Sequence, residues 1–161
     1  MVSDDDRELY VINIDAVRAF QERQYFNKLD DTDLWLKDNV FNQISESDLD
    51  IYGFEFGSPQ QKDQVKSMVY DFVIDINWYE EKDVEFWGYF AAYDHVCLAQ
   101  LFGRMIDLPP GMPMFTNDLM TIGKKPNSYY KPKPTRPADL PEHHALNDAK
   151  YQKLIFGAWN G

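Results

Sequence analysis

Three side chains of this 161-residue sequence are of the types that metal-assisted phosphoryl hydrolysis needs, namely Asp94, His143 and Asp148. His143 and Asp148 belong to the string His-x-Ala-x-x-Asp, which places an imidazole at the entrance of a predicted helix and a carboxylate on its first turns. An imidazole in that position can accept a proton, and a carboxylate is a hard oxygen ligand for magnesium. Asp94 follows an apolar run where a predicted strand gives way to a helix, the place where α/β sheets bind ligands. The pattern predicts that Asp94 and Asp148 bind Mg²⁺ and that His143 acts as a general base.

The apolar pattern predicts the alternating strands and helices that would position these side chains. Runs rich in β-branched and aromatic residues predict strands over Leu9–Ile14 and Val84–Phe90. Apolar residues at helical spacing predict helices over 33–44, from Ser58-Pro59 through Ile76, over 94–105, over 115–122 and over 140–159. Residues 123–139 contain one glycine and four prolines, so they are predicted to form a loop.

Composition and charge limit the kind of protein. A hydrophobic share of 44% and an aromatic share of 16% predict a single folded domain over residues 1–161. A net charge of −11 excludes binding of nucleic acid mainly through a broad basic surface, but bound divalent ions reverse the local field at carboxylates. The start of the sequence is not signal-like and no apolar run is long enough to span a bilayer, so we expect a cytoplasmic protein with no membrane partner. The lone cysteine, Cys97, is expected in the core rather than as a nucleophile.

The second half of the chain resembles a known nuclease family. The matching residues are Ala92-Tyr93-Asp94-His95-Val96 through Leu108-Pro109-Pro110, then Phe115-Thr116, and the later His-x-Ala-x-x-Asp-Ala. Together they resemble the bacterial and phage 3′–5′ exoribonucleases of the mycobacterial, ribonuclease T-like type, which belong to the DEDDh exonucleases. The resemblance covers residues 7 to 157 and is specific from Trp87 onward.

The resemblance implies an α/β fold of the ribonuclease H-like, three-layer exonuclease type, and it gives each candidate residue a role. Asp94 matches the acidic residue of the family's second motif, His143 the general base of the third, and Asp148 the final metal ligand. His144 fills a variable position of the third motif. The resemblance also implies Mg²⁺ as the cofactor, with Mn²⁺ as a substitute, and a homodimer.

The family's first motif, Asp-x-Glu on the opening strand, is not found at the matching place. Two such strings occur elsewhere, Asp6-Arg7-Glu8 and Asp83-Val84-Glu85. Asp83 and Glu85 begin the strand that leads to Asp94, and in an extended chain they would lie about 30 Å from it. We interpret both strings as solvated charge. Relative to the family, the sequence is interpreted as N-terminally truncated within the sheet, through a mis-called start codon or a gene fragment.

A loop rich in cations and aromatic residues precedes the helix with the His-x-Ala-x-x-Asp string. Lys131, Tyr130 and Lys133 lie in this loop, where phosphates could dock and bases could stack, although a solubilising proline loop explains the composition equally well. His95 is expected to be structural. A zinc hydrolase is the weaker interpretation of the three histidines near Asp94 and Asp148, because the sequence lacks the spacing of zinc ligands.

The expected activity is hydrolysis of phosphodiester bonds at RNA 3′ ends, with single-stranded DNA as a further substrate. Two magnesium ions about 4 Å apart would stabilise the attacking and leaving oxygens, and His143 would deprotonate the attacking water. The alternative is a catalytically inactive nucleic-acid-binding or assembly domain, which the missing Asp-x-Glu favours.

Overall fold

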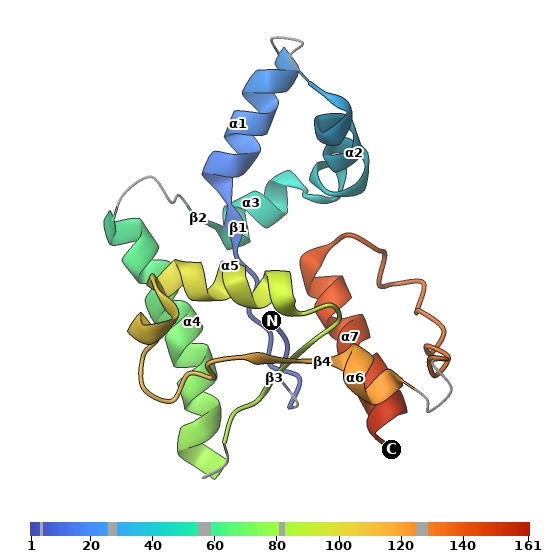
Figure 1. The fold of residues 1–161 in the computed structure, drawn as a ribbon. Coiled ribbons are helices and arrows are strands. Elements are labelled where there is room, and N and C mark those ends of the chain that lie inside the picture. Colours follow the sequence, from blue (N-terminus) through green and yellow to red (C-terminus); the bar gives the residue numbers. More distant parts are fainter. Residues whose placement is uncertain (4, 26–28, 55–58, 81–82, 125–128) are drawn as a thin grey trace.

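The computed structural model describes residues 1–3, 5–25, 29–54, 59–80, 83–124 and 129–161 (Figure 1). Helices dominate these residues, and the strands form two parallel pairs, β1 with β2 and β3 with β4. The α/β class predicted from the sequence is therefore confirmed. Within the described residues, no helix is both long enough and apolar enough to cross a membrane.

The first part of the chain forms a small helical unit around the pair of strands β1 (Ile12–Asn13) and β2 (Gly53–Phe54). Between these strands lie α1 (Ile14–Tyr25), α2 (Asp31–Asn39), the 3-10 helix η1 (Phe41–Gln43) and α3 (Glu46–Tyr52), which Figure 1 shows grouped at one end of the molecule. The predicted helix over 33–44 is thus confirmed in its first part and is replaced by η1 near its end.

The predicted strand over Leu9–Ile14 is wrong at both ends, because only Ile12 and Asn13 pair as a strand. Ile14 already begins α1, whose side chains Val17 and Phe20 are buried, and Phe20 stacks on Phe41 with 4.1 Å between the ring centroids. Burial of this helical face outweighs the β preference of the preceding apolar run.

Helix α4 (Pro59–Glu80) follows the predicted apolar stripe. Val65, Val69 and Val73 recur every four residues and are buried against Met112, which places them on one face of the helix. Met1 and other apolar residues of the amino-terminal segment pack against this cluster. The prediction of a long helix beginning at the proline is confirmed; Ser58 lies outside the described residues.

The second part of the chain is built around β3 (Phe86–Gly88) and β4 (Thr116–Asp118), which pair in parallel with Phe86 opposite Thr116. Helix α5 (Ala92–Phe102) and the 3-10 helix η2 (Met105–Asp107) connect them, and α6 (Leu119–Gly123) follows β4. The sequence predicts a helix over the whole of 115–122. That prediction is wrong for 116–118, because these residues satisfy their backbone by pairing with β3, a partner distant in sequence.

The terminal helix α7 (Ala145–Asn160) closes the second core. Its residues Ile155 and Trp159 are buried with Leu119 of α6, and Leu119 has no exposed surface. The predicted start at residue 140 was five residues early, because residues 138–143 form turns before His144 caps the helix.

Candidate active site

Asp94 lies where β3 ends and α5 begins. The strand stops at Gly88, residues 89–91 turn, and Ala91 precedes the first residue of the helix. A side chain at Gly88 would place its Cβ 3.0 Å from the Cβ of the buried Ala91, so small residues allow the turn to pack tightly. Asp94 thus comes on the first turn of α5, at the carboxyl end of the strand, as predicted.

The carboxyl group of Asp94 reaches a cavity in the protein. Although the residue as a whole is exposed, partial burial of its carboxyl group raises the pKa of Asp94 above the ordinary value for an aspartic acid. The cause is loss of hydration, which penalises the charged form of a carboxyl group. A group perturbed in this way within a cavity is a candidate for function.

His143 and Asp148 lie on either side of the start of α7. His144 is the cap residue, and its carbonyl oxygen accepts a hydrogen bond from the Asp148 amide at 2.8 Å. His143 comes just before the cap and has a left-handed backbone, with φ of 67°. The predicted order, an imidazole at the helix entrance followed by a carboxylate on the first turn, is therefore present.

Arg136 holds the carboxylate of Asp148. Its guanidinium donates to Asp148 Oδ1 at 2.5 Å and to the carbonyl oxygen of Pro141 at 3.0 Å. It also lies over the ring of Tyr151, 4.7 Å from the centroid. One cation thus connects the segment before His143 with the first turns of α7. A metal ion that binds Asp148 must share or displace this interaction.

The imidazole of His143 is directed toward the helical unit of the amino-terminal part. Its ring meets Trp35 of α2 edge-on, with 5.3 Å between centroids, and its Nε2 lies 4.0 Å from Glu142 Oε2. The adjoining backbone is anchored there too, because Gln43 Nε2 donates to the carbonyl oxygen of Glu142 at 2.6 Å. His143 is exposed, which leaves its ring accessible to a substrate.

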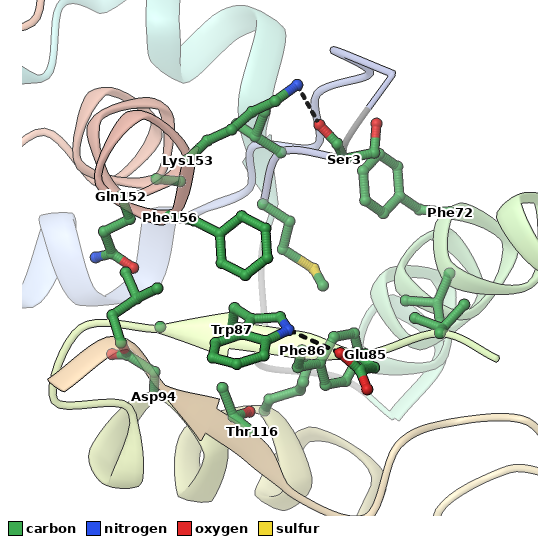
Figure 2. Close-up of a pocket in the computed structure, with 18 of the residues that line it drawn as sticks. Ser3, Phe72, Glu85, Phe86, Trp87, Asp94, Thr116, Gln152, Lys153 and Phe156 are labelled. Atoms are coloured by element: carbon green, nitrogen blue, oxygen red, sulfur yellow. Dashed lines mark hydrogen bonds between the residues drawn. The ribbon is translucent and has the colours of Figure 1, made fainter. Parts of the chain in front are cut away.

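One cavity of about 540 Å³ brings Asp94 and one face of α7 together (Figure 2). The α7 residues that line it are Ala149, Gln152, Lys153 and Phe156. Ala149 directly follows Asp148, so the predicted ligands come from two elements that border the same cavity. No group of three His, Cys, Asp or Glu side chains suited to a metal ion occurs in the part of the chain that is described.

Asp83 and Glu85 line this cavity as well. The expectation that they lie remote from Asp94 assumed an extended chain, and that assumption is wrong because the chain turns after Gly88. Both side chains are exposed, and Glu85 accepts a hydrogen bond from Trp87 Nε1 at 3.0 Å. The other Asp-x-Glu string is also at the surface, where Asp6 pairs with Lys153 and Glu8 with Lys150.

The predicted RNA-binding loop is docked on α7. Trp159 Nε1 donates to the carbonyl oxygen of Pro132 at 2.9 Å, and the amine of Lys131 donates to the carbonyl oxygen of Trp159. The amine of Lys133 lies 4.0 Å from the ring centroid of Tyr89, and Tyr130 is 51% exposed. Lys131 is therefore partly engaged in holding the loop, whereas Tyr130 and Lys133 are at the surface. Residues 125–128 of the loop lie outside the described residues.

Two further expectations concern α5. His95 Nδ1 lies 3.0 Å from Thr116 Oγ1, which joins the helix to β4 and fits the structural role expected for His95. Cys97 is exposed, so its expected position in the core is wrong; α5 directs that face outward.

Sequence reasoning missed the residues that surround the predicted ligands. Gln152 lines the cavity and its Oε1 accepts a hydrogen bond from the Tyr89 amide at 3.2 Å, which ties α7 to the turn before Asp94. Its spacing was a usable signal, because a residue four positions after Asp148 lies on the same helix face. Arg136 had no such signal, since its contact with Asp148 depends on the path of the intervening loop.

Fold and site together define an α/β domain with acidic side chains around a cavity at the end of a parallel strand pair. The family model described as "3′-5′ exoribonuclease Rv2179c-like domain" matches residues 20–159. The chain therefore belongs to the Rv2179c-like 3′–5′ exoribonuclease domain family. Its similarity to the 3′–5′ exoribonucleases Rv2179c and MT2234.1 of Mycobacterium tuberculosis strains H37Rv and CDC 1551 is 43% identity over 73 residues, or 45% of this chain. The match spans 41% of the length of each relative.

Proposed function

We propose that this chain provides part of a metal-dependent 3′–5′ exoribonuclease site, in which Asp94 and Asp148 bind Mg²⁺ and His143 is the general base. The observation that carries this proposal is the shared cavity: Asp94 at the end of β3 and the α7 residue that follows Asp148 both line it. The relatives are named 3′–5′ exoribonucleases, which favours the 3′ end of RNA as the substrate. Single-stranded DNA is a second substrate to test.

The donor set fits one magnesium ion better than two. Magnesium in proteins is commonly bound by one or two carboxylates, with waters and substrate phosphates as its other ligands. Asp94 and Asp148 can supply this number of carboxylates, but the described residues hold no cluster of three potential ligands. A site for two magnesium ions needs further acidic ligands. When bound, the cation would stabilise the charge that develops on the phosphate oxygens.

The chain's own residues would divide the remaining work. His143 accepts the proton of the attacking water, a role for which its exposed imidazole is accessible. Arg136 neutralises Asp148 through its hydrogen bond to that carboxylate until a cation displaces it. Tyr130 stacks on a base, and Lys133 and Lys131 contact phosphates. An ammonium group has three donors, so Lys131 can do this while still bound to Trp159.

The wider proposal includes a ribonuclease H-like arrangement of the complete sheet, a homodimer, Mn²⁺ as a substitute for Mg²⁺, and a cytoplasmic location. Sedimentation velocity of the purified chain tests the homodimer directly. A solved structure of the chain with its metal would test the fold.

The activity is tested with an oligoribonucleotide labelled at its 3′ end and a second one labelled at its 5′ end, each incubated with Mg²⁺. Release of labelled mononucleotide from the 3′ label, with stepwise shortening of the other substrate, is the expected result. His143→Ala should lower the rate by about 100-fold or more, the usual contribution of a general base. The matched control is Asp139→Ala, which removes an exposed side chain of the same segment and should leave the rate unchanged. Equal rates in the parent and His143→Ala remove the assigned role of His143.

A second candidate is a catalytically inactive domain that binds nucleic acid or takes part in an assembly. The lack of a three-ligand cluster among the described residues favours it. It predicts saturable binding of a labelled oligoribonucleotide in fluorescence anisotropy, with no shortening of the substrate in Mg²⁺ or Mn²⁺.

A further inference from the structure

The side chain of Arg136 is held from several sides. Its Nε donates to the carbonyl oxygen of Leu140, and a terminal nitrogen donates to the carbonyl oxygen of Pro141 at 3.0 Å. The guanidinium also lies over the ring of Tyr151, 4.7 Å from the centroid. The hydroxyl of Tyr151 donates in turn to the carbonyl oxygen of Pro134 at 2.8 Å. These contacts fix the position of the guanidinium independently of any carboxylate.

Arg136 is also more buried than the arginines of comparable ion pairs. Its side chain is 18% exposed, whereas the side chain of its partner Asp148 is 33% exposed. In the ion pairs that arginines form with Asp5, Asp33 and Asp107, the arginine side chain is 36%, 46% and 78% exposed. A guanidinium does not lose its proton in proteins, and one that has lost much of its hydration is destabilised unless an anion pairs with it. Arg136 therefore needs an anion beside it in the folded chain.

The proposed role of Asp148 takes this anion away from Arg136. The hydrogen bond to Asp148 Oδ1 is 2.5 Å long, and a divalent cation on the same carboxylate would both compete for its charge and repel the guanidinium. A substrate phosphate can replace the carboxylate, because substrate phosphates are common ligands of Mg²⁺ in proteins. The planar guanidinium matches the geometry of a phosphate with two parallel hydrogen bonds.

We propose that Arg136 binds the substrate phosphate that lies beside the cation, and that Asp148 blocks this arginine until Asp148 itself binds the cation. The guanidinium then passes from the carboxylate of Asp148 to a phosphate at the 3′ end of the RNA. This inference rests on the proposed function and deepens it. The contacts with Leu140, Pro141 and Tyr151 keep the guanidinium in place during the exchange. Phosphate binding and cation binding therefore strengthen each other, and this coupling is reciprocal.

The first experiment measures Mg²⁺ binding to the full chain by calorimetry, alone and with adenosine 5′-monophosphate or adenosine. In the parent, the monophosphate should tighten Mg²⁺ binding at least about tenfold, a usual size for coupling between two ligands, whereas adenosine carries no phosphate and should have no effect. Arg136→Met should reduce this tightening to less than about threefold. The matched control is Arg104→Met, which removes the arginine of an exposed ion pair with Asp107 and should behave as the parent. Equal tightening in the parent and Arg136→Met overturns the proposal.

The second experiment is done in EDTA and needs no metal. Asp148→Ala removes the carboxylate that blocks Arg136, so it should bind adenosine 5′-monophosphate at least about tenfold more tightly than the parent. Adding Arg136→Met to Asp148→Ala should abolish this gain. Asp148→Asn removes the charge but keeps the size of the side chain, and it provides the same comparison where the alanine variant does not fold. Equal binding by the parent and these variants, or a gain that persists without Arg136, overturns the proposal.

The shortening assay separates this inference from the proposed function. If Asp148→Ala gains phosphate binding through Arg136 but the parent does not shorten the oligoribonucleotide in Mg²⁺, the phosphate site stands and the nuclease proposal fails. If the parent shortens the oligoribonucleotide and Arg136→Met does so with unchanged KM and kcat, the nuclease proposal stands and the role of Arg136 is refuted.

Discussion

Gly123→Ala tests the packing that fixes the predicted RNA-binding loop to the terminal helix. A Cβ at Gly123 would lie 2.3 Å from Cζ3 and 2.5 Å from Cε3 of Trp159. Carbon atoms in favourable contact are about 3.5–4.0 Å apart, so the indole must move by about 1 Å or more. Trp159 is only 3% exposed, which leaves the ring little room to move.

The expected loss in the free energy of unfolding follows from the contacts of the Trp159 indole. Overpacking of a core costs about 1–3 kcal/mol. A shift of the ring also breaks the hydrogen bond from Trp159 Nε1 to the carbonyl oxygen of Pro132, now 2.9 Å long, at a further cost of about 0.5–1.5 kcal/mol. We therefore expect the free energy of unfolding to fall by about 2–4 kcal/mol. For a chain of this size that lowers Tm by roughly 5–15 °C.

The assay is urea denaturation followed by tryptophan fluorescence, with thermal unfolding by circular dichroism. Gly157→Ala is the matched control, because Gly157 lies in the same terminal helix as Trp159 and an added Cβ there meets no atom within 4 Å. It should raise the free energy of unfolding by about 0.5–1 kcal/mol, since alanine is the better helix former. If Gly123→Ala lies within about 0.5 kcal/mol of the parent, the size of ordinary surface effects, the packing argument is refuted.

Three further substitutions have outcomes that can be predicted from the surroundings of the replaced side chains. Partial burial raises the pKa of the Asp94 carboxyl, so the free energy of unfolding of the parent should fall as pH rises through that folded-state pKa. Asp94→Asn has no carboxyl at this position, so its free energy of unfolding should not show this fall in urea titrations between about pH 4 and pH 8. Ile155→Ala, at a side chain that is 1% exposed, should lower the free energy of unfolding by about 2–5 kcal/mol, and a change below about 1 kcal/mol in the same titration would contradict the assigned core. Arg136→Met should tighten Mg²⁺ binding in calorimetry, because the guanidinium and the cation compete for the carboxylate of Asp148. Unchanged or weaker Mg²⁺ binding would contradict this competition and would mean that Arg136 only positions the carboxylate.

The elements that could be predicted from sequence are those whose side chains decide their structure locally. The stripe Val65, Val69 and Val73 required a helix, because only helical spacing places these residues on one buried face. Strand β4 could not be predicted, because its three residues take their conformation from pairing with β3 about thirty positions earlier. Asp118 then caps α6 through its bond with the Met120 amide at 2.9 Å, so the helical signal of the following residues was real.

The residues of the candidate site also differ in whether the sequence could predict them. Asp94 and Asp148 were recognisable because each lies at the first turn of a helix whose start the sequence marks. Two contacts depend on how the segment 137–144 crosses the surface. They are the edge-on contact of the His143 ring with Trp35 and the ion pair between Arg136 and Asp148. No periodic pattern encodes that path, because the segment belongs to neither a helix nor a strand.

The acidic side chains themselves give a physical reason to place the cation at Asp94. Several aspartates of the described residues lie in ion pairs with arginine or lysine, including Asp5, Asp33, Asp63, Asp107 and Asp148. These contacts lower the pKa of Asp33 and Asp107, in each case chiefly through the hydrogen bond from an arginine. Asp94 differs, because desolvation without a compensating cation among the described ion pairs raises its pKa. A divalent ion would offset that desolvation, and Mg²⁺ binding should therefore lower the pKa of Asp94 and weaken as pH falls.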